Sequence, residues 1–446
     1  MTRLLVQSPD GAQPLADLDT LQVFTIGRAS GNDARFNDPA ISSHHIRLDR
    51  TAQGWTLTDL DSANGTSVDG LPVTGTVPLA APAEIVLGES VVLQFTDDSA
   101  PAPQAPAPPV EASEADVALV RAMRTRTEQI RREVAKVIVG QVEIVDQVLM
   151  VLIAGGHGLL VGLPGMAKTT LVATIANVLD MAFRRVQFTP DLMPTDITGT
   201  EILENDPASG EKRFRFIKGP IFTNLLLADE INRTPPKTQA ALLEAMQEKS
   251  VTVGNETYKL EPPFFVLATQ NPIEQEGTYP LPEAQQDRFM FNLWVDYPNE
   301  QEEELIVKTT TVTSAEKPQK VVSRQELLQL QAVVRKIPVS DHVIKYAIRL
   351  VRATRPGDEK SPDFIKKYVS NGAGPRAGQF LILAAKARAV LEGRIHVSCA
   401  DVARAALPVL RHRILSNFAA DSEGITPSNL VERLLQTVEQ PGEGDY

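Results

Sequence analysis

Residues 162–169 read Gly162-Leu163-Pro164-Gly165-Met166-Ala167-Lys168-Thr169, and this stretch decides the fold of the central part of the chain. An apolar run, residues 158–161, precedes it, and a helical pattern over residues 171–179 follows it. A strand, a glycine-containing loop, Lys-Thr and a helix in this order predict a phosphate-binding loop. The glycines let the backbone curl, so that successive N–H groups and the positive end of the helix dipole face one anion.

The loop supplies candidate ligands for ATP and Mg²⁺. Lys168 is placed to reach the β- and γ-phosphates, and the Thr169 hydroxyl is placed to bind Mg²⁺. The usual pattern has glycine before the lysine, whereas this chain has Ala167. Taken alone, the stretch also fits an ordinary strand-to-helix turn. The candidate nucleotide-binding residues are Val139, Gly140, Gly162, Pro164, Gly165, Met166, Ala167, Lys168, Thr169 and Thr170.

Two acids follow a second apolar run, residues 225–228. Such a run predicts a buried parallel strand, and α/β sheets bind ligands at the carboxyl ends of their strands. We expect Asp229 to hold Mg²⁺ through water and Glu230 to polarise the attacking water. A further buried strand ends at Asn271, whose amide is placed to orient that water. Paired acids after a strand are common, but about 60 residues beyond a phosphate loop they indicate a nucleotidase.

Composition narrows the classes of function. The chain has 446 residues, 43% of them hydrophobic, and a formal net charge of −12. This acidity argues against a nucleic-acid partner. The single cysteine, Cys399, excludes an intrachain disulfide and fits a reducing compartment. The N-terminus lacks a signal-peptide pattern, and the most apolar stretch, residues 148–154, is too short for a membrane span. We therefore expect a cytoplasmic protein without a membrane span.

Residues 1–97 alternate short runs rich in Val, Leu, Thr and Phe with turn signals, which predicts a β-sandwich. Three polar islands lie between the runs: Arg28 after Gly27, residues 42–45, and Asn64 before Gly65. Arginine, hydroxyl and amide side chains on loops at one end of a sandwich are good ligands for phosphate and for a peptide backbone.

These islands resemble the pattern of the forkhead-associated (FHA) family, which is Gly-Arg, then Ser-x-x-His, then Asn-Gly. The resemblance covers about residues 1–97 and implies recognition of phosphothreonine in an extended peptide. It implies that Arg28 and Ser42 hold the phosphate, that Asn64 grips the peptide backbone and that His45 braces the loop. Ser43, also assigned to the phosphopeptide site, stands where the family often has arginine. The alternative is a sandwich that serves only as a docking surface.

The remaining patterns divide the chain further. Residues 98–113 are rich in proline and alanine, which predicts a semi-rigid linker. Residues 114–298 carry the α/β pattern of the phosphate-loop core. Residues 299–446 predict a helical lid. We therefore expect a multidomain chain: an all-β sandwich, an α/β core and an α-helical lid. The lid's candidate helices are residues 324–336, 341–353, 376–391, 400–411 and 428–439.

Several local structures are expected within the core. Residues 234–246 are expected to form a helix capped by Thr234, and residues 281–289 to form a helix that carries an arginine at its end. Residues 251–258 predict a hairpin. The run at residues 212–219 alternates basic and aromatic residues, which fits a strand with phenylalanines on one face and arginines on the other. It also fits a nucleic-acid contact, and we favour the hairpin.

Four blocks of this core resemble the MoxR family of AAA+ ATPases: residues 162–169, 229–239, 268–272 and 281–289. The resemblance runs from about residue 115 to the C-terminus. It implies a ring of identical subunits, commonly six, that binds ATP and Mg²⁺ between subunits and remodels or assembles a partner protein. A protein with a von Willebrand A-type domain is a further partner that the resemblance implies. The FHA resemblance adds a phosphothreonine-containing protein.

The same resemblance assigns roles by position. Asn271 matches the first sensor, and Arg288 matches an arginine finger that reaches the γ-phosphate in the neighbouring subunit. Arg376 begins a helix of the lid and matches the second sensor. Arg233 competes with Arg288 for the contact in trans. An ion pair of Arg288 with a neighbouring acid and a solvated Arg376 are the alternatives.

The interpretation from sequence is an ATP-hydrolysing ring motor with a phosphothreonine-reading module. Two other functions use the same residues and stay open. One is a scaffold in which nucleotide switches assembly with little turnover. The other is a chelatase-type motor subunit for metal insertion, which would need a metal-inserting partner. Net charge argues against a fourth possibility, a nucleic-acid motor.

Overall fold

The computed structural model describes residues 2–8, 11–51, 54–73, 75–79, 81–88, 91–97, 113–205, 212–254, 256–273, 277–311 and 316–440. The chain divides into two compact units, Met1–Pro108 and Pro109–Tyr446. The predicted linker lies outside the described residues except for Ser113, whose hydroxyl accepts from the Asp116 N–H at 3.2 Å and caps the first helix of the second unit. No helix in the described ranges is long and apolar enough to cross a membrane.

The first unit is the expected β-sandwich. Alternate residues of its strands point inward, and Leu4, Ile26, Leu48, Leu57 and Leu93 are fully buried between two sheets. One sheet has the strand order β2-β1-β11-β10-β7-β8 and the other β4-β3-β5-β6-β9. The strands are β1 (Thr2–Ser8), β2 (Gly11–Asp17), β3 (Val23–Gly27), β4 (Ala34–Arg35), β5 (Ile46–Thr51), β6 (Gly54–Asp59), β7 (Thr66–Val68), β8 (Leu71–Pro72), β9 (Thr76–Leu79), β10 (Ala83–Leu87) and β11 (Val91–Asp97).

The second unit is built on a parallel sheet with helices on both faces. Its strand order is β13-β16-β19-β12-β20, so the phosphate-loop strand lies inside the sheet. Alternate residues serve opposite faces: Leu160 and Leu227 pack under α2 and α3, whereas Leu159 and Leu226 pack under α5. The elements are α1 (Glu114–Ala135), α2 (Val142–Ala154), β12 (Gly158–Gly162), α3 (Lys168–Val178), β13 (Phe183–Gln187), β16 (Leu225–Asp229), η1 (Ile231–Arg233), α5 (Pro236–Glu248), β19 (Phe265–Gln270), α6 (Glu283–Gln286) and β20 (Phe291–Val295).

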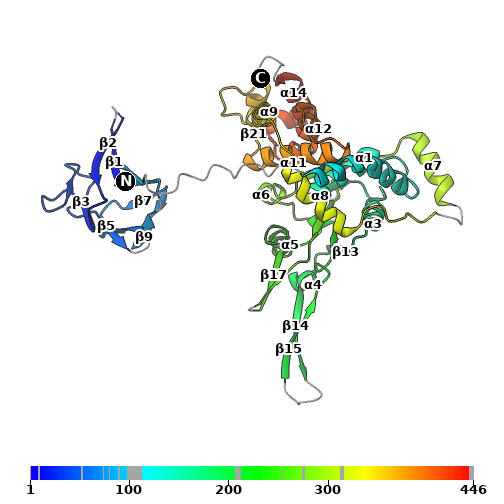
Figure 1. The fold of residues 1–446 in the computed structure, drawn as a ribbon, viewed down its shortest axis with the longest axis horizontal. Helices are drawn as coiled ribbons and strands as arrows, with labels where there is room; N and C mark the ends of the chain where they lie inside the picture. Colours follow the sequence, from blue (N-terminus) through cyan, green and yellow to red (C-terminus); the bar gives the residue numbers. More distant parts are fainter. Residues whose placement is uncertain are drawn as a thin grey trace. The chain divides into compact units, whose positions relative to one another are not determined.

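Two hairpins leave this sheet. β14 (Gly199–Asn205) follows α4 (Pro194–Thr198) and pairs with β15 (Lys212–Lys218), and β17 (Ser250–Val253) pairs with β18 (Glu256–Lys259), as predicted. The first hairpin extends away from the rest of its unit (Figure 1). Phe216 stacks on Tyr258 of the second hairpin with ring centroids 4.1 Å apart, whereas the Phe214 side chain is 74% exposed. The longer hairpin is therefore packed near its base.

The lid contains the five predicted helices with bounds that agree to within two residues, and they share one core with α1 and α2. The sequence interpretation did not propose its three other helices or its small sheet. The elements are α7 (Glu300–Thr310), α8 (Arg324–Lys336), α9 (Asp341–Ala353), α10 (Asp363–Tyr368), β21 (Val369–Asn371), α11 (Pro375–Leu391), α12 (Cys399–Leu410), β22 (Leu415–Ser416), α13 (Phe418–Ser422) and α14 (Pro427–Thr437).

Two local predictions were wrong. Thr234 does not cap α5: Pro235 is at the cap position, and the Thr234 hydroxyl donates to the Thr189 carbonyl at 2.9 Å. The helix expected over residues 281–289 is only the short α6. It stops at residue 286, because the Arg288 and Phe289 N–H groups donate three residues back, to the Gln285 and Gln286 carbonyls, and the Met290 N–H donates to the His157 carbonyl at 2.7 Å.

His157, just before β12, is a buried histidine whose protonation is expected to make the stability of this unit depend on pH. Its Nδ1 accepts from the Val266 N–H at 3.0 Å and its Nε2 faces the Met246 carbonyl at 3.2 Å, so the buried ring is held in its neutral form. Burial lowers the pKa of His157 to about 4. In the unfolded chain the imidazole takes up a proton near pH 6.5. The contribution of neutral His157 to the free energy of unfolding is therefore fully present above that pH, and about 3 kcal/mol of it is lost as the pH falls towards 4.

We expect urea unfolding to show this loss between pH 7 and pH 4.5. The matched variant is His157→Gln, which keeps a donor and an acceptor but does not titrate. Its stability should depend on pH less steeply than that of the wild type over this window. Equal slopes would show that His157 does not contribute.

Candidate nucleotide and phosphopeptide sites

The phosphate loop joins β12 to α3 with the backbone that the motif requires. Gly165 has φ +83°, which glycine adopts without strain. A Cβ on Gly162 would lie 2.5 Å from the Val295 carbonyl oxygen, so a side chain there would push the loop away from β20. Ala167, where the motif usually has glycine, is in the left-handed region at φ +53° and makes no side-chain cap for α3. The N-terminal N–H groups of α3 are therefore left for an anion.

Lys168 points back along its own loop. Its Nζ donates to the carbonyl oxygens of Gly162 and Leu163, the latter at 2.8 Å. Burial lowers the pKa of Lys168, while the charges of Asp229 and Glu230 act in the opposite direction. The ammonium thus sits beside the loop, held by weak neutral acceptors that a phosphate would outcompete.

Asp229 lies at the carboxyl end of β16 and is only 8% exposed. One carboxylate oxygen accepts from the Thr269 hydroxyl at 2.5 Å and the other from Arg185 Nε at 2.8 Å. The sequence interpretation missed both partners. Arg185 and Thr269 come from β13 and β19, the two strands on either side of β16, so parallel pairing is the signal that places them there.

Glu230 occupies a strained position directly after Asp229. Its φ is +57°, and its N–H donates to the Thr269 hydroxyl at 2.8 Å. Its carboxylate accepts from Gln187 Nε2 at 2.6 Å and lies 3.3 Å from Arg233 Nε. A non-glycine residue in this conformation costs roughly 1–3 kcal/mol and is found where function requires it. The turn aims Glu230 away from the strand and towards the loop.

A cavity of about 320 Å³ brings most of these predicted residues together. Asn271, which is 5% exposed, lines the cavity as predicted. Thr269 and Arg185 also line it, and sequence reasoning missed these two residues. Val139 and Gly140 do not line it; their neighbour Gln141 donates to the Met166 carbonyl at 3.4 Å, which ties that segment to the loop. The predicted residues on its wall are Pro164, Gly165, Met166, Ala167, Lys168, Thr169, Thr170, Asp229, Glu230 and Asn271.

The donor set fits a nucleotide polyphosphate with Mg²⁺. A helix N-terminus, a lysine and a threonine hydroxyl face a buried aspartate across one small cavity, which is the ligand chemistry that both groups require. Bound Mg²⁺ would neutralise charge on the phosphate oxygens. Thr169 and Asp229 would hold it, and Glu230 would accept a proton from water.

The two arginines predicted to contact ATP from outside the phosphate loop, Arg288 and Arg376, do not line this cavity. Arg376, at the start of α11, donates to Asp287 Oδ2 at 3.0 Å. The Arg288 side chain is half-buried and makes no hydrogen bond or ion pair with any described residue. The alternative of an ion pair with Asp287 does not hold in this structure, because the Asp287 carboxylate binds Arg376 and Arg413 instead.

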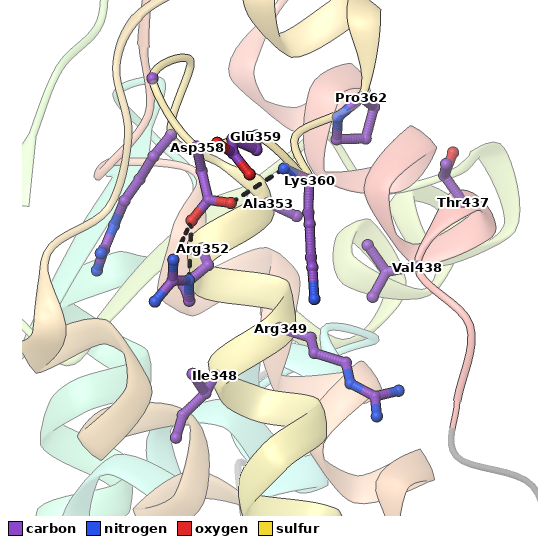
Figure 2. Close-up of a pocket in the computed structure, with 12 residues that line it drawn as sticks. Ile348, Arg349, Arg352, Ala353, Asp358, Glu359, Lys360, Pro362, Thr437 and Val438 are labelled. Carbon is purple, nitrogen blue, oxygen red and sulfur yellow. Dashed lines mark hydrogen bonds and ion pairs between the residues drawn. The ribbon is translucent and has the colours of Figure 1, made fainter.

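A larger cavity, about 910 Å³, lies within the lid, between α9 and the end of α14. Figure 2 shows the side chains of Arg349 and Lys360 beside it and the pair of Arg352 with Asp358, whose atoms are 2.7 Å apart. None of the residues predicted for chemistry lines it. Size alone therefore does not locate the nucleotide site; the convergence of phosphate loop and acids does.

The three polar islands of the first unit meet at one end of the sandwich. Arg28 is exposed, and its N–H donates to the Ser42 carbonyl at 2.8 Å. The Ser42 hydroxyl accepts from the Ala63 N–H at 2.9 Å, and Asn64 Nδ2 donates to the Ala40 carbonyl at 2.9 Å. Ser43 is exposed beside them.

His45 joins these loops from inside the sandwich. It is fully buried, its Nδ1 accepts from the Ser42 N–H at 3.0 Å, and its Nε2 lies 3.1 Å from the Gly65 carbonyl. The expected role of a brace is therefore what the geometry shows. A Cβ on Gly27 would lie 2.4 Å from the Ser43 carbonyl, so the strand before Arg28 must also end in glycine.

Comparisons with known proteins agree with this division. Residues 157–291 match the ATPase family associated with various cellular activities (AAA), residues 364–434 match the AAA lid domain, and residues 24–88 match the FHA domain. The protein named chaperone MoxR1 of Mycobacterium tuberculosis is 45% identical over 69% of this chain and 81% of its own length. Bacillus subtilis YeaC is 40% identical over 69% and 92%.

Among solved structures, a protein from Cytophaga hutchinsonii assigned as an ATPase is 41% identical. It covers 74% of this chain and 98% of its own, with a TM-score of 0.68. The matched relatives, the parallel sheet with its phosphate loop and the helical lid lead to one assignment. The chain belongs to the MoxR family of AAA ATPases, and it carries an FHA domain ahead of the ATPase unit.

Proposed function

We propose that this protein is an ATP-hydrolysing motor that remodels or assembles a partner protein. The observation that carries the proposal is Glu230, held at a strained turn by Thr269 and Gln187 beside a buried aspartate and a phosphate loop. A nucleotide switch without turnover has no need for a carboxylate fixed where water would attack. ATP and Mg²⁺ are the proposed substrate and cofactor.

The proposed active unit is a ring of identical subunits, with six as the expected number. Arg288 supports this because the residue is half-buried, its side chain has no described partner within its own chain, and it does not line the chain's own nucleotide cavity. In the ring, Arg288 of one subunit would face the nucleotide of the next. Hydrolysis would then depend on contact between subunits.

The FHA domain is proposed to recruit a phosphothreonine-containing protein, which is either the client or a regulator. Exposed Arg28 and Ser43 flank the hydroxyl of Ser42, and Asn64 is fixed at the neighbouring loop. Binding there would raise the local concentration of the client at the motor. A partner with a von Willebrand A-type domain remains a proposal without a structural observation of its own.

Arg28→Ala is expected to weaken binding of a phosphothreonine peptide by about 10- to 100-fold, because one charge-assisted contact to phosphate is worth roughly 1.5–3 kcal/mol. Calorimetry with the full-length protein measures this against the unphosphorylated peptide. Arg50→Ala is the matched control, because Arg50 lies near the other end of β5 and donates to the Asp19 carbonyl. If the wild type and Arg28→Ala bind the phosphothreonine peptide equally well, Arg28 does not hold the phosphate, and the domain would serve only as a docking surface.

Client choice can be tested by capture in cells. The bait is the Glu230→Gln protein loaded with ATP, with and without Arg28→Ala, and phosphorylation is mapped in the captured proteins. A phosphothreonine-containing protein lost only with Arg28→Ala supports the proposed recruitment. The same proteins on both baits would assign client choice to the ATPase unit.

A further inference from the structure

The backbone that carries Arg288 is attached to the lid chiefly through a buried residue, Arg413. Its guanidinium donates to the Asp287 carbonyl at 2.8 Å, to the Phe289 carbonyl at 2.7 Å and to the Met290 carbonyl at 3.4 Å. The neighbouring His412 places Nε2 3.1 Å from the same Phe289 carbonyl. Arg288 therefore lies in a segment whose backbone acceptors on both sides are held by the lid.

Asp287 completes this attachment. Arg413 Nε donates to its Oδ1 at 2.7 Å, and the Arg413 side chain is only 2% exposed, so Asp287 is the counter-charge of a buried cation. Burial lowers the pKa of Arg413 to about 10, and the charge of Asp287 opposes that shift. The Arg413 guanidinium also lies 5.0 Å from the Phe380 ring of α11. The segment is therefore held from two sides: Arg413 binds it from the lid, and the Met290 N–H donates to the His157 carbonyl of the core at 2.7 Å.

The second carboxylate oxygen of Asp287 holds Arg376, at 3.0 Å and with 42% of the Arg376 side chain exposed. Arg413 is locked by four backbone carbonyls in addition to the Asp287 carboxylate, whereas Arg376 has only the Asp287 carboxylate among the described contacts. The two arginines therefore differ in how easily each can be separated from Asp287. An exposed pair of this kind is worth about 0–1 kcal/mol, so a phosphate can readily take Arg376 from Asp287.

We propose that Arg413 and Asp287 are positioning residues for Arg288: Arg413 fixes the segment to the lid, and Asp287 releases Arg376 when nucleotide binds. The state of the lid in one subunit would thereby set the placement of the arginine offered to the next subunit. This inference rests on the proposed function, in which Arg288 acts in trans. It adds the two residues that position Arg288, and it names the contact that nucleotide binding would break, which is the pair of Asp287 with Arg376.

The test separates the effect of a substitution on the nucleotide site of the neighbouring subunit from its effect on the nucleotide site of the same subunit. Arg288→Ala subunits keep an intact site but offer no arginine, and Glu230→Gln subunits offer Arg288 but do not hydrolyse. Mixing the two should restore ATPase activity at sites that combine both contributions. The decisive variant to mix with Arg288→Ala is Glu230→Gln/Arg413→Lys. Lysine keeps a positive charge at residue 413 but lacks the several guanidinium N–H donors that hold residues 287–290. It should restore at least tenfold less activity than Glu230→Gln alone.

The matched control is Glu230→Gln/Arg394→Lys. Arg394 is another lid arginine in a carboxylate network, with Asp401 and Glu392, and it does not contact residues 287–290. This control should restore as much activity as Glu230→Gln. Equal restoration by the Arg413→Lys partner would overturn the inference. No restoration by Glu230→Gln alone would instead refute Arg288 in trans, and with it the proposed ring mechanism.

Two measurements without turnover complete the test and cover a poorly folding Arg413 variant. Hydrogen exchange should show faster exchange over residues 287–291 in Arg413→Lys, with unchanged exchange over the phosphate loop. Asp287→Asn should bind a non-hydrolysable ATP analogue more tightly than wild type, because Arg376 is already released, while its kcat falls. Weaker or unchanged affinity would contradict the exchange of Arg376.

Discussion

Replacing Glu230 by glutamine is expected to lower kcat for ATP hydrolysis by about 10²–10⁴-fold, the usual contribution of a positioned general base. Glutamine keeps the size of the side chain and its contact with Gln187, but its amide does not accept a proton from water. The bonds that shape the turn run from the Glu230 N–H to the Thr269 hydroxyl and from that hydroxyl to Asp229, and they do not involve the lost charge. The loop and its helix remain intact, so nucleotide affinity should change little.

Steady-state hydrolysis and equilibrium binding of a fluorescent ATP analogue measure the two quantities separately. Glu244→Gln is the control, since Glu244 is an exposed residue on α5 that does not line the cavity. A wild-type rate already near background would favour the scaffold alternative. A variant that lost affinity and turnover together would make Glu230 a structural residue of the turn.

Replacing Arg288 by alanine is expected to lower kcat by about 10³-fold or more, as loss of an arginine finger does in other nucleotidases. The affinity for nucleotide should be retained, because Arg288 does not line the cavity of its own chain. Arg233→Ala should have a smaller effect. Arg233 lies 3.3 Å from Glu230 within the same chain, so its loss acts through the orientation of that carboxylate.

The measurement is kcat at protein concentrations above and below assembly, with the oligomeric state followed by light scattering. Activity per subunit should rise with assembly in the wild type and stay low throughout in Arg288→Ala. If Arg233→Ala loses turnover while Arg288→Ala keeps it, the two assignments are exchanged. If activity per subunit does not depend on assembly, neither residue acts in trans.

The sequence predicted what rests on local pattern. The strand before Gly162 and the strand before Asp229 are continuous apolar runs, and parallel pairing brings their ends together. The lid helix Arg324–Lys336 has the bounds that were predicted, and Ser323 and Glu326 form a capping box, which is a local signal. These features need only the neighbouring residues.

The missed residues depend on contacts between distant segments. Arg185 reaches Asp229 across 44 positions of sequence, and Arg413 reaches Asp287 across 126. Arginines of this kind carry no local signal, because charged residues are normally found on solvated faces. The short α6 was mispredicted for a related reason: beyond it the Met290 N–H donates to the His157 carbonyl, which is distant in sequence.

The His45 imidazole gives the FHA domain a property that its exposed residues do not reveal. Because one buried ring bonds the Ser42 N–H and contacts the Gly65 carbonyl, we expect that the loop proposed to bind phosphate and the loop proposed to bind the peptide backbone do not rearrange separately. If these loops are already ordered in the folded domain, little entropy is lost when a ligand binds. We therefore expect the site to select ligands by a rigid fit rather than by rearranging around them. The spacing between phosphate and backbone contacts would then filter ligands as strictly as the phosphate itself.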